Sequence, residues 1–222
     1  MKRFITVLTI LVTMAAWVAL AYAKPKSKVL LIPREGNSRN LELMLTKEVG
    51  VMVGMLEKAG FEVEVANASG EPIASENMTL KPDLKLVDVK VADYAGFIMA
   101  CMAVGIIPSP PQPAEAVAIV KQAAAQDKPI AAQFGAVQIL AEAGILKGKR
   151  YAFMFDPLGA RLGPNKDPRF ADAIYSGTDV IQDGNIITSA ICPYIGAMRN
   201  IPDGTAELTQ KLIAELKKRK NP

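Results

Sequence analysis

The sequence predicts a three-layer α/β sandwich built on a mainly parallel sheet. Two observations indicate this fold. Short, continuous apolar runs alternate along the chain with longer stretches in which apolar residues recur at helical spacing. Continuous apolar runs are typical of strands that are buried on both faces of a parallel sheet. Their alternation with helices favours a sheet that is covered by helices on both sides.

The first elements form a βαβ unit. Residues 28–32 are an apolar run that Pro33 ends, and they are the first predicted strand. Apolar residues recur every three or four positions from 40 to 58, which predicts a helix that ends at Ala59-Gly60. Residues 61–66 alternate apolar and acidic side chains and form the second strand. The connection between the two strands is expected to be right-handed.

The middle of the chain begins with a polar stretch, in which we expect a short extended segment at 84–87. A third strand is predicted at 96–100, and the proline-rich residues 108–113 then form a stiff loop. A helix follows at 114–126, and a strand and a helix share residues 130–143.

The last third contains a predicted strand at 151–155 and a loop rich in glycine and proline at 156–170, which is expected to cross the surface. Residues 180–188 look like a strand pair around a tight turn. An amphipathic helix at 205–220 closes the fold.

Residues 1–23 have the pattern of a secretory signal peptide. Lys2-Arg3 is followed by an apolar run and by Ala21-Tyr22-Ala23, a small-x-small cleavage site. We therefore expect residues 24–222 to be a single domain that is periplasmic or secreted. The alternative is an uncleaved leader, which would be the protein's only contact with a membrane.

Composition excludes several classes of function. Removal of Lys2 and Arg3 with the leader leaves 24 basic residues against 22 acidic ones, a net charge of +2, so nothing indicates nucleic-acid binding. The chain has no histidine, which excludes Ser-His-Asp and Cys-His catalysis and zinc sites that need imidazole. We expect no cofactor and no metal. Two cysteine thiolates alone could bind Cu(I), but no Cys-x-x-Cys or methionine-rich motif supports this.

Residues 128–148 carry a family resemblance. Lys128-Pro-Ile-Ala-Ala132 and the later Leu140-Ala-Glu-Ala-Gly-Ile-Leu-Lys-Gly148 resemble the ThiJ/PfpI family, in which the first motif continues with Ile-Cys-His-Gly. The resemblance implies a flavodoxin-like, class I glutamine-amidotransferase-like fold with a nucleophile at the turn between strand and helix. Here Phe134 stands in place of the family's Cys, and Gly135 in place of the His of many members.

Three further segments carry the same resemblance. Glu48 has the spacing of the family's helical glutamate, which reaches toward the nucleophile. Residues 93–102 resemble the strand and turn that contribute a backbone N–H to an anion site, with Cys101 and Met102 in place of glycines. Residues 180–193 resemble a later motif, in which Cys192 replaces the glycine before proline.

The departures from the family gather at one edge of the predicted sheet, while the framework positions are kept. We expect a refitted ligand pocket at this edge, formed by Met102, Gln133, Phe134, Gly135 and Cys192. Phe134 would either fill the family's pocket or form an apolar wall for a different ligand. The Gln133 amide is a candidate for hydrogen bonds to that ligand.

The changed residues leave three functions open. The favoured hypothesis is a small-molecule-binding or stress-related accessory protein without the family's chemistry. Its rival is a hydrolase- or glyoxalase-like enzyme with a relocated centre, in which Cys101 is the nucleophile and Glu48 the acid/base. The third is a structural protein with a closed pocket. The resemblance also implies a homodimer, and the small-molecule partner is unidentified.

Cys101 and Cys192 would meet an oxidising compartment after export. The family's sheet order implies that the strand before Phe134 lies between the strands that lead to them. Strands two apart are separated by roughly 9.5 Å, whereas a disulfide needs Cα atoms at roughly 4.4–6.8 Å. This disfavours a bridge, although loops beyond the strand ends could curl together, so whether the two are thiols or bridged stays open.

Overall fold

The computed structural model describes residues 26–35, 41–101 and 112–220. A seven-stranded sheet in the order β10-β11-β7-β6-β1-β2-β5 forms its centre. Neighbouring strands are parallel except β10 and β11. The strands are β1 (Lys28–Ile32), β2 (Glu62–Asn67), β5 (Leu84–Lys85), β6 (Tyr94–Met99), β7 (Ile130–Gln133), β10 (Ile181–Asp183) and β11 (Ile186–Ser189).

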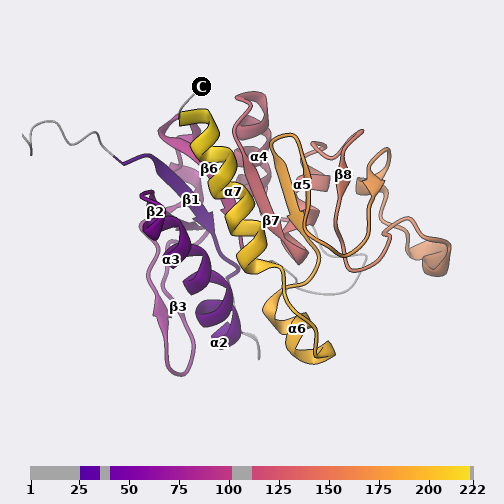
Figure 1. Ribbon diagram of the computed structural model, residues 1–222, viewed down its shortest axis with the longest axis horizontal. Coiled ribbons are helices and arrows are strands. Elements are labelled where there is room, and N and C mark those ends of the chain that lie inside the picture. The colour runs from indigo at the N-terminus through magenta and orange to yellow at the C-terminus, as the bar shows by residue number, and fades with distance from the viewer. Residues whose placement is uncertain (1–25, 36–40, 102–111, 221–222) are drawn as a thin grey trace, which may run out of the picture.

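Helices cover both faces of the sheet (Figure 1). One face carries α2 (Leu41–Leu43), the π-helical turn η1 (Met44–Val49), α3 (Gly50–Lys58) and α7 (Thr205–Lys220), and the other carries α4 (Ala114–Ala125) and α5 (Val137–Glu142). Leu30 packs into the core on the α4–α5 side, and its neighbour Leu31 packs into the core on the α3–α7 side. This alternation explains the continuous apolar run and confirms the predicted three-layer α/β sandwich.

The order of the strands reverses between β1 and β6. The chain passes from β1 to β2 on one side of β1, and β6 then pairs on the other side. Just beyond the ends of these strands, the Ala100 N–H donates to the Ile32 carbonyl at 3.0 Å. Such a reversal of strand order is the place at which open α/β sheets bind ligands.

The prediction of a strand at 151–155 is wrong. Only β8 (Arg150–Tyr151) forms there, and it pairs with β9 (Ile174–Tyr175) outside the central sheet. The Ala152 N–H instead donates to the Thr188 hydroxyl at 2.8 Å, and the Phe153 N–H donates to Gly177 at 3.1 Å. Because the N–H groups of these consecutive residues bond to different segments, the pairing between β8 and β9 does not continue past Tyr151.

The loop predicted at 156–170 does not stay on the surface. It contains the short turns η5 (Ala160–Asn165) and η6 (Pro168–Phe170), and Phe170 is fully buried against Tyr151 and Phe153. The other short elements are β3 (Ile73–Ala74), β4 (Thr79–Leu80), η2 (Leu86–Asp88), η3 (Val91–Asp93), η4 (Phe134–Ala136) and α6 (Pro193–Arg199).

The strand pair around Gly184 and the closing helix are confirmed as β10–β11 and α7. Within the described residues, no helix is both long and apolar enough to cross a membrane. The predicted signal peptide, Met102 and most of the proline-rich stretch lie outside the described residues.

Candidate functional site

The turn between β7 and α5 keeps an unusual backbone. Phe134 lies at φ +43°, in the left-handed region that side-chain-bearing residues rarely adopt. Its ring stacks on Phe153, with ring centroids 5.7 Å apart and planes 17° from parallel. Such strain persists only where the surrounding fold enforces it. The turn thus has a constrained geometry but carries an aromatic side chain, and Gly135 beside it is buried.

Gln133 anchors a neighbouring segment. Its fully buried side chain donates through Nε2 to the Ile191 carbonyl at 2.6 Å, and the Gly204 N–H donates to the same oxygen at 2.8 Å. These two bonds fix the chain immediately before Cys192. Gln133 Oε1 has no hydrogen-bond partner among the described residues. The hydrogen bond that the Gln133 side chain makes in this structure is therefore with the backbone of residue Ile191.

Glu48 projects from the π-helical turn. The Gly50 N–H donates to the Leu45 carbonyl, five residues back, which makes this turn wider than an α-helical one. The Glu48 side chain is only 2% exposed, and its Oε1 accepts the backbone N–H of Cys101 at 2.5 Å. The structure thus brings together Glu48 and Cys101, which the sequence proposes as one centre.

Cys192 joins this pair from the opposite side of β7. Its side chain is hydrogen-bonded to that of Cys101, and both residues are thiols in this structure. Cys101 is 8% exposed and Cys192 is 2% exposed. We call Glu48, Cys101 and Cys192 the thiol cluster. Its apolar surroundings include Ala152, Ala190, Ile191 and Ile195, with Phe134 and Met154 partly buried against them.

The sheet order confirms that β7 lies between β6 and β11, yet the two cysteines still meet. β7 ends at Gln133, and the chain turns away at Phe134. The segments after β6 and β11 continue past that level and close over the end of β7. A strand-to-strand distance therefore does not measure the separation of side chains that lie beyond the strand ends.

The cluster shifts the acidities of its members in opposite directions. Burial raises the pKa of Glu48 well above its usual range, and the nearby Cys101 and Asp203 raise it further against the Cys101 N–H and Arg34. The hydrogen bond from Cys101 lowers the pKa of Cys192, despite burial and the Glu48 charge. Environments that separate two groups in this way define an acid and a base. Glu48 therefore holds its proton to a higher pH than an ordinary carboxyl group, whereas Cys192 releases its own more readily than an ordinary thiol.

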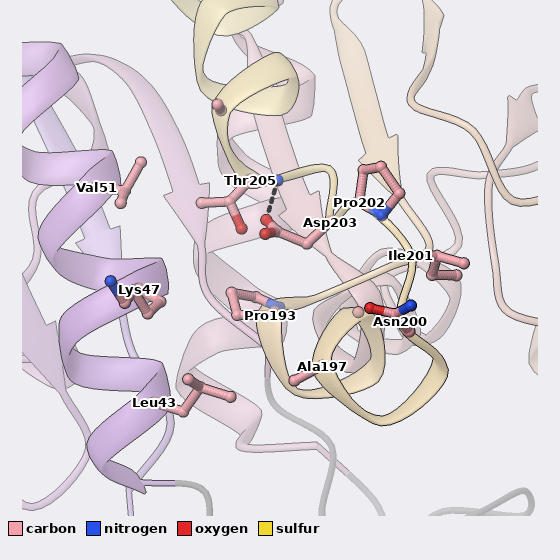
Figure 2. Close-up of a pocket in the computed structure, with 12 residues that line it drawn as sticks. Leu43, Lys47, Val51, Pro193, Ala197, Asn200, Ile201, Pro202, Asp203 and Thr205 are labelled. Carbon is pink, nitrogen blue, oxygen red and sulfur yellow. Dashed lines mark hydrogen bonds between the residues drawn. The ribbon is translucent and has the colours of Figure 1, made fainter.

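A groove with a volume of about 650 Å³ lies on the outer side of the cluster. Figure 2 shows Leu43, Lys47 and Val51 on one wall and α6 with the chain after it on the other. Lys47 directly precedes Glu48, and Pro193 directly follows Cys192. The groove's lining includes none of the pocket residues expected from the sequence, namely Gln133, Phe134, Gly135 and Cys192.

The profile of the DJ-1/PfpI family matches residues 41–199, a range that includes every member of the thiol cluster. The chain belongs to the DJ-1/PfpI family. An uncharacterized protein of Archaeoglobus fulgidus is 35% identical over 141 residues, which are 60% of this chain and 75% of that protein.

Solved structures of DJ-1/PfpI proteins have the same fold. A ThiJ/PfpI domain protein from Brachyspira murdochii has a TM-score of 0.63 at 15% identity, covering 87% of this chain and 99% of that one. Drosophila melanogaster DJ-1beta has a TM-score of 0.55 at 20% identity, covering 86% and 91%. At these identities the likeness establishes the fold alone.

Two features of the site escaped the sequence. The sequence disfavours a disulfide between Cys101 and Cys192 and does not reveal that their side chains are hydrogen-bonded as thiols. It makes Gln133 a candidate for hydrogen bonds to a ligand, whereas Gln133 Nε2 donates to the Ile191 carbonyl in this structure. The available signal was that each cysteine follows a strand that neighbours β7. No cluster of three or more metal-ligating side chains occurs within the described ranges.

Proposed function

We propose that this chain is an exported DJ-1/PfpI protein with a stress-related role, which reacts with small electrophiles through the thiol cluster. The observation that carries the proposal is the 2.5 Å hydrogen bond from the Cys101 N–H to Glu48, beside the paired cysteine side chains. It holds a buried acid beside two thiols at the carboxyl edge of the sheet, the usual location of α/β ligand sites. Phe134 cannot supply the family's nucleophile.

The geometry suggests a distinct role for each member of the cluster. Cys192 is the nucleophile, because the thiolate is the reactive form and its pKa is lowered. Cys101 donates the hydrogen bond that stabilises this thiolate. Glu48, whose pKa is raised by burial, is placed to protonate a leaving group. This assignment differs from the rival hypothesis of the sequence analysis, in which Cys101 is the nucleophile and Glu48 the acid/base.

Alkylation by iodoacetamide across a range of pH tests the proposal, with each cysteine-containing peptide quantified by mass spectrometry. We expect Cys192 to be modified with a midpoint below about 8.5, the reference pKa of a free thiol. Cys101→Ala should raise this midpoint, because it removes the hydrogen-bond donor. Modification of Cys192 only in unfolded protein would contradict the proposal.

Glu48→Gln provides a second reading of the same assay. It should shift the Cys192 midpoint to lower pH, because the carboxylate form of Glu48 opposes ionisation of this thiol. Glu57→Gln is the matched control, since it makes the same substitution at an exposed carboxylate on α3. An equal shift in both variants would show that the cluster itself has no special effect.

Export and assembly are parts of the proposal with tests of their own. Cleavage after Ala23 would leave Lys24 at the N-terminus of natively expressed protein, which intact mass measurement detects. A cytoplasmic species that retains Met1 would refute export. The homodimer that the family resemblance implies is tested by light scattering of the mature protein.

A second candidate function is binding of a small molecule in the groove. The buried hydroxyl of Thr205 lies on its wall without a hydrogen-bond partner among the described residues. Lys47 and Asp203 place opposite charges on its two sides (Figure 2), which suits a zwitterion. We expect a free amino acid from a standard panel to raise the melting temperature, and Lys47→Ala to abolish that rise. No shift with any member of the panel would exclude this candidate.

A further inference from the structure

The thiol cluster contains both of the chain's cysteines. Cys101 comes two residues after β6, and Cys192 comes three residues after β11. Their side chains are already hydrogen-bonded to each other within one apolar cluster. The side chains therefore need only a short approach to reach the bonding distance of a disulfide, roughly 2.05 Å.

Burial limits what can react with this pair. Cys192 is 2% exposed and Cys101 is 8% exposed, so a bulky disulfide or protein partner cannot reach either sulfur without opening the fold. A molecule as small as a hydroperoxide needs far less space. The carboxyl of Glu48 lies beside the pair and accepts the Cys101 N–H at 2.5 Å. A leaving oxygen produced at this site would thus have a proton donor close by.

We propose that Cys101 and Cys192 form a reversible disulfide when a hydroperoxide oxidises Cys192, with Glu48 as the proton donor. This inference rests on the proposed function in one respect, namely that Cys192 is the reactive thiol. In the first step the Cys192 thiolate attacks the hydroperoxide, and the O–O bond breaks. Cys192 becomes a sulfenic acid, and the leaving alkoxide takes a proton from Glu48 to become an alcohol.

Cys101 completes the reaction. Its sulfur attacks the sulfur of the sulfenic acid, the S–O bond breaks, and the departing hydroxide takes the Cys101 proton to become water. The net reaction converts one hydroperoxide and two thiols into one alcohol, one water and one disulfide. An external dithiol returns the pair to its reduced form by thiol–disulfide exchange. The site thereby reduces hydroperoxide in repeated cycles, and the fraction of protein in the disulfide form reports how much hydroperoxide is present.

The experiment treats reduced, full-length mature protein with one equivalent of hydrogen peroxide. We expect intact mass to fall by two hydrogen atoms and a non-reduced digest to contain the peptide pair joined through Cys101 and Cys192. Dithiothreitol should reverse both changes. The oxidised form should also melt higher, by about 5–10 °C, because the bridge restricts a long segment of the unfolded chain.

Single variants separate the two steps. Cys101→Ser should stop at a Cys192 sulfenic acid, trapped with dimedone, because the resolving thiol is gone. Glu48→Gln should slow peroxide oxidation at least about tenfold, because the proton donor is absent, although it makes iodoacetamide alkylation easier at low pH. Glu57→Gln should change neither rate. Opposite effects of one variant on two thiol reactions would not follow from a general loosening of the structure.

The outcomes distinguish this inference from the proposed function. If Cys192 is alkylated at low pH but peroxide yields only sulfinic acid, or leaves both thiols titratable, the disulfide is refuted and the thiol centre stands. If the disulfide forms although Cys192 resists alkylation in folded protein, the electrophile proposal fails and the redox pair stands. A Glu48→Gln variant oxidised as fast as the natural protein would refute the proton-donor role.

Discussion

The turn at Phe134 and the thiol cluster lie at the same edge of the sheet, and they differ in what they contain: one has a constrained backbone, and the other has titratable side chains. The turn has an unusual backbone conformation, because Phe134 lies at φ +43° between β7 and α5. The thiol cluster has the chemistry: a buried acid and two hydrogen-bonded thiols, on segments that show no left-handed residue at Glu48, Cys101 or Cys192.

This difference separates what a fold enforces from what a side chain supplies. The strand and helix around Phe134 must be joined by a sharp turn whichever residue occupies it, so the backbone strain survives the loss of a nucleophile. The thiols need no special backbone, because their acidities depend on burial and hydrogen bonds. The reactive side chains of such a fold can therefore lie on a neighbouring loop, while the residue at the strained turn serves only in packing.

The largest expected effect follows from that packing role. Phe134→Ala removes a ring that stacks on Phe153 and contacts the thiol cluster. We expect the free energy of unfolding to fall by about 2–3 kcal/mol, below the usual cost for a fully buried ring because Phe134 is half-buried. Denaturant unfolding measures the change.

The same variant should shift the pH midpoint of Cys192 alkylation only slightly, and to lower pH, because loss of the ring reduces burial but removes no hydrogen bond. The hydrogen bonds that lower the pKa of Cys192 come from Cys101, Ile195 and Tyr194, and none comes from Phe134. A large shift of the midpoint would show that Phe134 helps to set the pKa of Cys192, and the two regions would then have to be treated as one site. Phe155→Ala is a suitable control for the loss of an aromatic ring near Phe153.

The frame of this site could be predicted from the sequence because it depends on local patterns. The apolar run before Phe134 and the helical spacing up to Ala143 placed β7 and α5 correctly. The contact between Glu48 and Cys101 followed from family spacing, since one helix and one strand end determine it. Cys101 therefore lies beside Glu48, as the sequence suggested.

The remaining features depend on distances that no local pattern encodes. Whether Cys101 reaches Cys192 is decided by the paths of the segments that follow β6 and β11, and residue alternation does not reveal these paths. The strand predicted at 151–155 failed for a similar reason, because the Thr188 side chain takes the Ala152 N–H. The groove forms between the turn η1 and α6, which are far apart in the chain.

A smaller effect is expected in the pH dependence of stability. The pKa of Glu48 is raised in the folded state, so between its unfolded value, about 4.3, and its folded value the folded state holds a proton that the unfolded state has released. Stability should therefore fall as pH rises through this window. Glu48→Gln should remove this decline, so its free energy of unfolding relative to the natural protein should rise with pH across this window.

Denaturant unfolding at a series of pH values measures this prediction, with Glu57→Gln as the matched control. Cys192 acts in the opposite direction, since its pKa is lowered on folding and its contribution is lost as pH falls through the folded value. Parallel pH profiles for the natural protein and Glu48→Gln would mean that Glu48 ionises normally in the folded state.

The smallest effect isolates the strain at the turn. Glycine usually destabilises a protein relative to alanine, because it frees the unfolded backbone. At φ +43° the order of stability should reverse. Glycine has no Cβ, whereas the Cβ of alanine clashes with the backbone in this conformation. We expect Phe134→Gly to be about 1 kcal/mol more stable than Phe134→Ala in denaturant unfolding. Neither variant has the ring, so their difference reports the backbone alone. If alanine proves equal or better, the turn relaxes when Phe134 is removed, and it is the packing of this ring on Phe153 that holds the strained conformation.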